Sequence, residues 1–215
     1  MISKRIKELA AIIPSANRVI DVGCDHALLD IYLAKKYPDT KFLATDISEN
    51  AINSALKNIK ENNLESRIST SVTDGLDNIS LNKDDFIVIS GMGTNTIKHI
   101  LKPRLNEINN ILIQTNRDFE ELREFMFENG FRTKDEKIIH DKLYYVVMLF
   151  EKGEFKYTSL DLWLGPIIKN SKNDSYFEFL LKNYKKILPG IPDNDLKKNE
   201  VMEKINVLSS LIEKK

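Results

Sequence analysis

The segment Arg18–Ala27 constrains the fold of this chain more than any other stretch of its sequence. It begins with the β-branched residues Val19, Ile20 and Val22, which are typical of a strand buried inside a parallel sheet. Gly23 permits a sharp turn, and an apolar-faced helix is expected directly after it. A helix that begins at the carboxyl end of a parallel strand marks the place where an open α/β sheet binds its ligand. The segment therefore predicts an α/β fold with a ligand site at this first turn.

Strand-like and helix-like patterns alternate along the following hundred or so residues. Strands are expected over 18–23, 41–46, 67–72, 85–90 and 110–114, and helices over 27–37, 49–62, 94–102 and 118–128. Two more strand-like runs, 131–140 and 142–150, are joined by a short turn and form a hairpin. Alternation that ends in a hairpin predicts a mostly parallel seven-stranded sheet with an antiparallel edge strand.

Apolar spacing assigns buried faces to two helices near the start of the chain. The first has one apolar stripe and ends at Pro14. The second is expected to begin after Ser48 as its N-cap, with Ile52, Leu56 and Ile59 facing inward.

The sequence pattern changes after Gly153. Apolar residues recur at steps of three and four in two segments that flank a proline-rich turn: Phe177, Leu180, Tyr184, Ile187, Val201, Ile205, Leu208 and Ile212. Narrow seams of this kind predict an antiparallel helical hairpin similar to a short coiled coil. Two domains are therefore expected, a sheet domain over 1–153 and a helical domain over 154–215.

Charge and composition limit the class of protein. The formal net charge is zero, so any surface that attracts nucleic acid must be local. Cys24 is the single cysteine, which excludes an internal disulfide and fits a reducing compartment. The first helix carries charges, unlike a signal peptide, and no apolar run reaches the roughly 20 residues of a membrane span. We expect a cytoplasmic monomer without membrane contact.

Acidic residues at the ends of the first two strands narrow the class of ligand. Asp46 stands where an acidic side chain normally takes the two hydroxyls of a ribose. A dinucleotide site needs further glycines after Gly23, but Asp25 and Leu28 occupy those positions, and Asp25 would repel a pyrophosphate. The negative charges of Asp21 and Asp25 suit the sulfonium and the ammonium of S-adenosylmethionine. The residues alone also allow a purely structural role for each aspartate, namely a tight turn at Asp21 and a helix cap at Asp46.

The later strand ends offer further ligand groups. Asp74-Gly75 follows the third strand and can accept a hydrogen bond from an adenine amino group. Gly91-Met92-Gly93 follows the fourth strand and presents backbone groups to the methionine part or to an incoming base. Asn116 follows the fifth strand with a neutral amide. Each also has a structural reading, namely an Asx turn, a glycine-rich turn and a solvated loop.

The histidines and the cysteine do not form a metal or nucleophilic site in the sequence. His26 is expected at a helix N-terminus, where a ligand contact and a structural role both stay open. His99 and His140 have no partners at metal-ligand spacing, and neither does Cys24. No metal is expected.

Four motifs together resemble a known family. Asp21-Val22-Gly23-Cys24-Asp25-His26-Ala27, Gly91-Met92-Gly93, Leu112-Ile113-Gln114-Thr115-Asn116 and Leu164-Gly165-Pro166 are similar to the bacterial tRNA (adenine-N1)-methyltransferases that act on tRNA position 22, the TrmK family. The similarity covers essentially the whole chain. Thr115 and Thr94 differ from the family pattern, which has proline and often glycine at these positions.

The resemblance implies a Rossmann-like class I methyltransferase domain followed by a coiled-coil-like helical domain that helps to hold tRNA. The implied activity is methyl transfer from S-adenosylmethionine to N1 of an adenine in the D-arm. The expected cofactor-binding residues are Asp21, Gly23, Cys24, Asp25, His26, Asp46, Ile47, Asp74, Gly75, Gly91, Met92 and Gly93. Asp25 and Asn116 are expected to be catalytic, by stabilising the cationic product and by gripping the base, and pure cofactor binding stays open for Asp25.

Other functions stay open on the residues alone. A small-molecule methyltransferase could use the helical tail for dimerisation, and a nucleotide- or RNA-binding protein could retain the fold without catalysis. A nicotinamide-linked oxidoreductase is disfavoured by the missing glycines. Lysines and arginines that could contact phosphate are Lys4, Arg5, Lys182, Lys185 and Lys186, although each also suits a solvated helix face.

Overall fold

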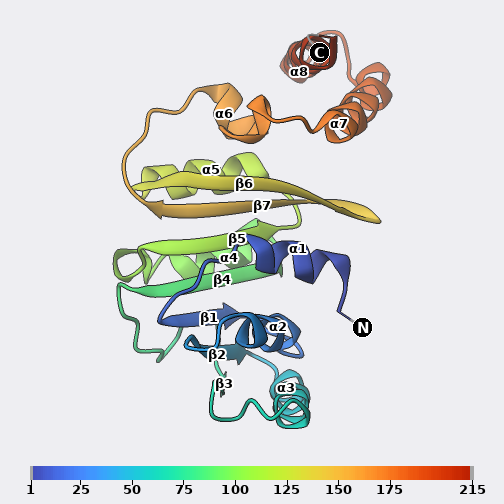
Figure 1. Ribbon diagram of the computed structural model, residues 1–215. Helices are drawn as coiled ribbons and strands as arrows, with labels where there is room; N and C mark the ends of the chain where they lie inside the picture. Colours follow the sequence, from blue (N-terminus) through green and yellow to red (C-terminus); the bar gives the residue numbers. More distant parts are fainter. Residues whose placement is uncertain (1, 214–215) are drawn as a thin grey trace. The chain divides into compact units, whose positions relative to one another are not determined.

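The computed structural model describes residues 2–213 and contains one seven-stranded sheet (Figure 1). Its strands are β1 (Arg18–Val22), β2 (Lys41–Asp46), β3 (Ile68–Val72), β4 (Asp85–Met92), β5 (Asn110–Thr115), β6 (Phe131–Asp141) and β7 (Leu143–Lys152). They lie in the order β3-β2-β1-β4-β5-β7-β6. The neighbouring pairs β3–β2, β2–β1, β1–β4 and β4–β5 are parallel, and β7 is antiparallel to both of its neighbours. The mostly parallel sheet with an antiparallel edge is confirmed, with β7 inserted one position inside the edge strand β6.

Helices cover both faces of the sheet (Figure 1). α1 (Lys4–Ile12), α2 (Leu28–Lys36) and α3 (Glu49–Glu61) lie on one face, and α4 (Thr94–Leu101) and α5 (Phe119–Glu128) lie on the other. Alternate residues of the central strands point to each face, so Val19, Val88 and Leu112 join the apolar cluster beneath α1, α2 and α3. A parallel sheet buried on both faces leaves its carboxyl edge as the place for a ligand.

The N-cap predicted for α3 is confirmed. Of the three residues predicted to face inward on this helix, one does not. The Ser48 hydroxyl accepts a hydrogen bond from the Ala51 N–H at 3.3 Å. Ile52, Ala55 and Ile59 form the buried face, whereas Leu56 is 48% exposed. At 100° per residue Leu56 lies on the margin of a face centred on Ile59, and the small Ala55 lets the helix approach the sheet on the other side of that centre.

The sheet unit continues beyond Gly153 and ends at Lys169. α6 (Ser159–Leu164) begins with a capping box between Thr158 and Asp161 and contacts α5. Below it, the buried Arg123 Nε donates to Glu136 Oε1 at 2.8 Å, and Arg123 Nη1 also donates to the carbonyl of Leu162. This Arg123–Glu136 pair fastens residues 158–169 to the sheet unit.

The second compact unit begins at Asn170 and is helical. α7 (Asp174–Ile187) and α8 (Leu196–Glu213) pack on each other across a short 3₁₀ turn at Leu188–Gly190. Their buried residues are Tyr176, Phe177, Val201 and Leu208. The predicted pair of tail helices is confirmed.

Candidate functional site

A cavity of about 690 Å³ lies at the carboxyl ends of β1, β2 and β4. Most of the cofactor-binding residues expected from the sequence line it: Asp21, Gly23, Cys24, Asp25, His26, Asp46, Gly91 and Met92. Its volume falls within the range of roughly 300–1,000 Å³ that is usual for sites of small ligands and cofactors. The topology therefore brings residues from three separate strand ends to one place.

The remaining candidates do not line this cavity. Ile47 is 69% exposed, and Asp74 lies in a separate cavity of about 380 Å³ beside His99. Gly75 packs against Ile100. Neither Gly75 nor Gly93 lines the 690 Å³ cavity.

The Asp46 carboxylate is fixed at the mouth of the cavity by backbone donors. Its Oδ1 accepts from the Ser48 N–H at 2.9 Å, and its Oδ2 accepts from the Asp25 N–H at 3.2 Å. The Gly23 N–H donates at 2.8 Å to the carbonyl of Thr45, which ties the first turn to β2. Each carboxylate oxygen keeps acceptor capacity for a hydroxyl group. This geometry fits a carboxylate that holds a ribose.

Two glycines with a left-handed backbone shape the cavity wall. Gly23 has φ +77°, and a Cβ there would clash with the side chain of Met92. Gly91 has φ +83°, and a Cβ there would meet no atom within 4 Å. The left-handed backbone favours glycine at both positions. At Gly23 a Cβ would meet only the flexible end of the Met92 side chain, which can move, whereas the open space at Gly91 lets a ligand approach the backbone.

A buried pair of acids lies beneath the cavity, and the sequence analysis missed one of them. Asp21 lines the cavity, while Asp30 on α2 is fully buried, and no N–H group and no hydroxyl of the described residues donates to either of its oxygens. Burial and the neighbouring Asp30 raise the pKa of Asp21 well above its ordinary value. Burial also raises the pKa of Asp30, to about 6. We interpret the two carboxyl groups as sharing one proton, which lets one donate to the other.

Replacing Asp30 by asparagine is expected to flatten the pH dependence of folding stability. In the wild type the folded pair holds a proton that the unfolded chain releases above its ordinary pKa of 3.8. Stability therefore falls as the pH rises from about 4 through the raised folded pKa, by about 1–3 kcal/mol. In Asp30→Asn the amide donates to Asp21 and the charge of Asp30 is gone, so this loss becomes smaller, although burial still raises the pKa of Asp21. Urea unfolding from pH 5 to pH 8 measures it, and parallel curves for the two proteins would contradict the shared proton.

The other polar groups of the first turn are less suited to chemistry. The Asp25 side chain is 76% exposed and lies 3.5 Å from His26 Nε2. Water screens its charge, so Asp25 stabilises a nearby cation only modestly. Burial and the neighbouring aspartates raise the pKa of the Cys24 thiol, which keeps it neutral and unsuited to act as a nucleophile.

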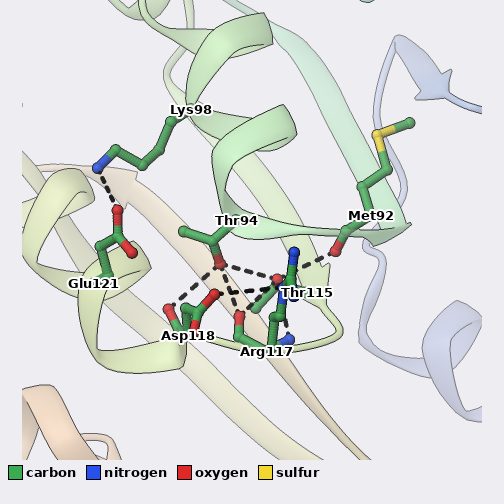
Figure 2. Close-up of polar contacts among 7 residues, drawn as sticks. All are labelled: Met92, Thr94, Lys98, Thr115, Arg117, Asp118 and Glu121. Carbon is green, nitrogen blue, oxygen red and sulfur yellow. Dashed lines mark hydrogen bonds and ion pairs between the residues drawn. The ribbon is translucent and has the colours of Figure 1, made fainter.

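Paired threonines hold the ends of β4 and β5 together (Figure 2). The Thr94 and Thr115 hydroxyls lie 3.0 Å apart, and Thr94 also donates to the carbonyl of Arg117 at 2.8 Å. Beside them the Asn116 N–H donates to the Met92 carbonyl at 3.1 Å, and Asn116 Nδ2 donates to Gly91 O at 2.8 Å. The two threonines that differ from the family pattern are thus in contact, and together they fix the loop that carries Asn116.

The sequence profile of the tRNA (adenine(22)-N(1))-methyltransferases, TrmK, matches residues 19–214. This chain belongs to the TrmK family. A Bacillus subtilis protein named tRNA (adenine(22)-N(1))-methyltransferase is 30% identical over 182 residues, which cover 80% of this chain and 76% of that protein.

Solved structures agree with this membership. The structure of M. capricolum TrmK in complex with S-adenosyl-homocysteine is 31% identical and covers 99% of this chain and 98% of that chain, with a TM-score of 0.84. The crystal structure of the B. subtilis m1A22 tRNA methyltransferase TrmK is 25% identical, covers 99% of both chains and has a TM-score of 0.84. The expected Rossmann-like methyltransferase fold, the enzyme class and S-adenosylmethionine as the cofactor are confirmed.

The cavity of this TrmK protein fits that cofactor. Its three carboxylates, Asp21, Asp25 and Asp46, suit a ligand with a sulfonium and an ammonium, and the open space at Gly91 admits close contact with the backbone. Within the described residues no cluster of side chains is suited to hold a metal ion. None of the helices in that part of the chain is both long and apolar enough to cross a bilayer.

Several lining residues escaped the sequence analysis because they come from helix faces. Ile6 and Leu9 of α1 and Asn50 and Ser54 of α3 all line the cavity. The apolar stripe of α1 indicated burial, but it did not indicate which part of the sheet the helix would cover. Arg5 was considered only as a phosphate contact, yet it also lines the cavity.

Proposed function

We propose that this protein transfers a methyl group from S-adenosylmethionine to N1 of the adenine at position 22 of tRNA. The observation that carries the proposal is the Asp46 carboxylate, held by two backbone N–H groups at the mouth of an acidic cavity in a TrmK fold. The lone, buried cysteine favours action in a reducing cytoplasm, and we expect a monomer.

The reaction asks for positioning more than for covalent chemistry. When bound, S-adenosylmethionine supplies a methyl group that is already activated on a sulfonium. Adenine N1 presents a lone pair in the plane of the ring and carries no proton that a base must remove. The residues of the chain therefore bind and orient the two reactants.

Three carboxylates share this task. Asp46 holds the ribose, and Asp21 faces the cationic end of the cofactor. Asp25 lies at the mouth, where its negative charge favours the cationic methylated base, with a modest effect because the side chain is 76% exposed. Asn116 grips the base from the end of β5.

Mapping of the modified nucleotide tests the function directly. Unmodified tRNA is incubated with the protein and isotope-labelled S-adenosylmethionine, and the product is digested and sequenced by mass spectrometry. We expect label at N1 of adenine 22. Incorporation into a metabolite extract but not into tRNA would favour a small-molecule methyltransferase, and cofactor binding without transfer would favour a non-catalytic binding protein.

Removal of the C-terminal helical unit is expected to separate the two binding steps. A protein that ends at Lys169 keeps the Arg123–Glu136 pair and its partners, so its cofactor affinity should change less than about twofold. Loss of phosphate contacts from Lys182, Lys185 and Lys186 should lower tRNA methylation on the order of 100-fold. Calorimetry and tRNA methylation assays measure the two effects, and full methylation by the shortened protein would exclude a substrate role for this unit.

A further inference from the structure

A second cavity of about 330 Å³ adjoins the cofactor cavity at the ends of β4 and β5. The two cavities share Arg5 and Gly91 in their linings. Asn116, Tyr144 and Tyr145 also line the smaller one. A compartment of this size, which opens beside the cofactor site and has both polar and apolar walls, suits a small planar group that makes both kinds of contact.

Aromatic side chains form one wall of the second cavity. Tyr144 and Tyr145 lie at the start of β7, where both are half-buried. Tyr144 stacks on His140 with ring centroids 4.4 Å apart, and the Arg5 guanidinium lies 5.2 Å from the centre of the Tyr145 ring. An aromatic wall suits a nucleobase, because base–aromatic stacking contributes about 1–3 kcal/mol per base.

The amide of Asn116 is oriented in advance on another side of the cavity. Its Nδ2 donates to Gly91 O at 2.8 Å, and its Oδ1 accepts from Gln114 Nε2 at 3.2 Å. One N–H and one oxygen lone pair are left for an occupant. Asparagine pairs in this way with N6 and N7 of adenine, which leaves the N1 edge of the base unblocked.

Arg5 supplies the positive charge at the boundary of the two cavities. Its backbone N–H donates to Asp141 Oδ2 at 3.2 Å, which fixes this end of α1 against the β6–β7 turn. The guanidinium takes part in no ion pair with a carboxylate of the described residues. A guanidinium without such a partner is suited to a phosphate group.

We propose that the second cavity receives the adenine that is to be methylated, with Tyr145 as its stacking wall and Arg5 as the partner of its phosphate. The inference rests on the proposed function, because it assigns a place to the base on which that function acts. The target adenine must leave its stack to enter the cavity. Tyr145 and Arg5 thereby become substrate-binding residues of the methylation site.

Substitutions in the full-length protein test this assignment. Tyr145→Ala should lower kcat/KM for tRNA by about 10-fold or more, while Tyr145→Phe keeps the ring and stays within about twofold of wild type. Arg5→Gln should raise KM for tRNA, and Lys7→Gln, an exposed change on the same helix, should not. The Kd for S-adenosylmethionine should stay within twofold in both Tyr145 variants and in Lys7→Gln, none of which lies in the cofactor cavity. Unchanged kcat/KM in Tyr145→Ala, or a parallel loss of cofactor affinity, would overturn the assignment.

A crosslink gives a second readout that does not depend on the folding of a variant. Transfer RNA with 8-azidoadenosine at position 22 is irradiated with the wild-type protein, and the attached peptide is sequenced. We expect attachment within residues 143–145, and attachment to α3 would overturn the proposal. If the wild-type protein fails to methylate any tRNA, the proposed function itself is wrong. If it methylates adenine 22 and the variants behave as wild type, only the proposed position of the base is wrong.

Discussion

Replacement of Asp46 by alanine is expected to weaken S-adenosylmethionine binding by about 100-fold or more. The carboxylate offers a charged acceptor to two ribose hydroxyls, and hydrogen bonds to charged groups contribute about 1.5–3 kcal/mol each. The same change also removes the acceptor for the N–H groups of Asp25 and Ser48, so the first turn is left with only its backbone bonds to the Thr45 carbonyl.

Calorimetry with the folded variant measures this effect. Asp39→Ala removes an exposed carboxylate in the turn between α2 and β2 and should leave the Kd within about twofold of wild type. Asp21→Ala should also weaken binding, because Asp21 faces the same cavity. Wild-type affinity in both the Asp46 and the Asp21 variant would refute the assignment of the cofactor site.

Replacement of Glu136 by alanine is expected to destabilise the sheet unit by about 3–5 kcal/mol. The side chains of Arg123 and Glu136 are 2% and 0% exposed, so the substitution leaves a buried guanidinium without its counter-charge. Glu136 Oε2 also accepts the N–H of Ile167 at 3.1 Å, and a Cβ at Gly165 would clash with the same carboxylate. The pair thus fixes the chain where it leaves the sheet unit.

A matched surface pair serves as the control for this prediction. Glu151 on the neighbouring strand β7 pairs with Arg132 and Lys134, whose side chains are about half exposed. Glu151→Ala should cost no more than about 1 kcal/mol. Chemical denaturation of both variants gives the comparison, and equal losses of stability would show that burial does not set the strength of the Arg123–Glu136 pair.

The sequence predicted the parts of this fold that depend on local pattern. Short apolar, strand-like runs located every strand within one or two residues, and Ser48 correctly marked the start of α3. The first turn and Asp46 could be assigned to one site because parallel strands align their carboxyl ends at the same edge of the sheet. Gly91 and Met92 joined them for the same reason.

Features that depend on packing between distant segments were not predictable in this way. No local sequence pattern predicts that β7 lies between β5 and β6, because either strand of a hairpin can pair with the edge of a sheet. In the sequence, Asp30 looks like an ordinary polar residue of a helix. Only the packing of α2 on the sheet shows that it is buried beside Asp21. Arg123 and Glu136 lie on different elements, and only the assembled sheet unit shows that they meet.

The attachment of α1 to β6 affects how the protein matures during its synthesis. Lys4 Nζ donates to the carbonyl of His140 at 3.0 Å, and Glu8 forms an ion pair with Lys137. α1 also packs on α2, but its polar contacts with β6 can form only after nearly the whole sheet has been translated. A nascent chain that stalls before β6 lacks these contacts, so α1, which lines the cofactor cavity through Arg5, Ile6 and Leu9, is held less firmly. Such an intermediate should be a client for chaperones.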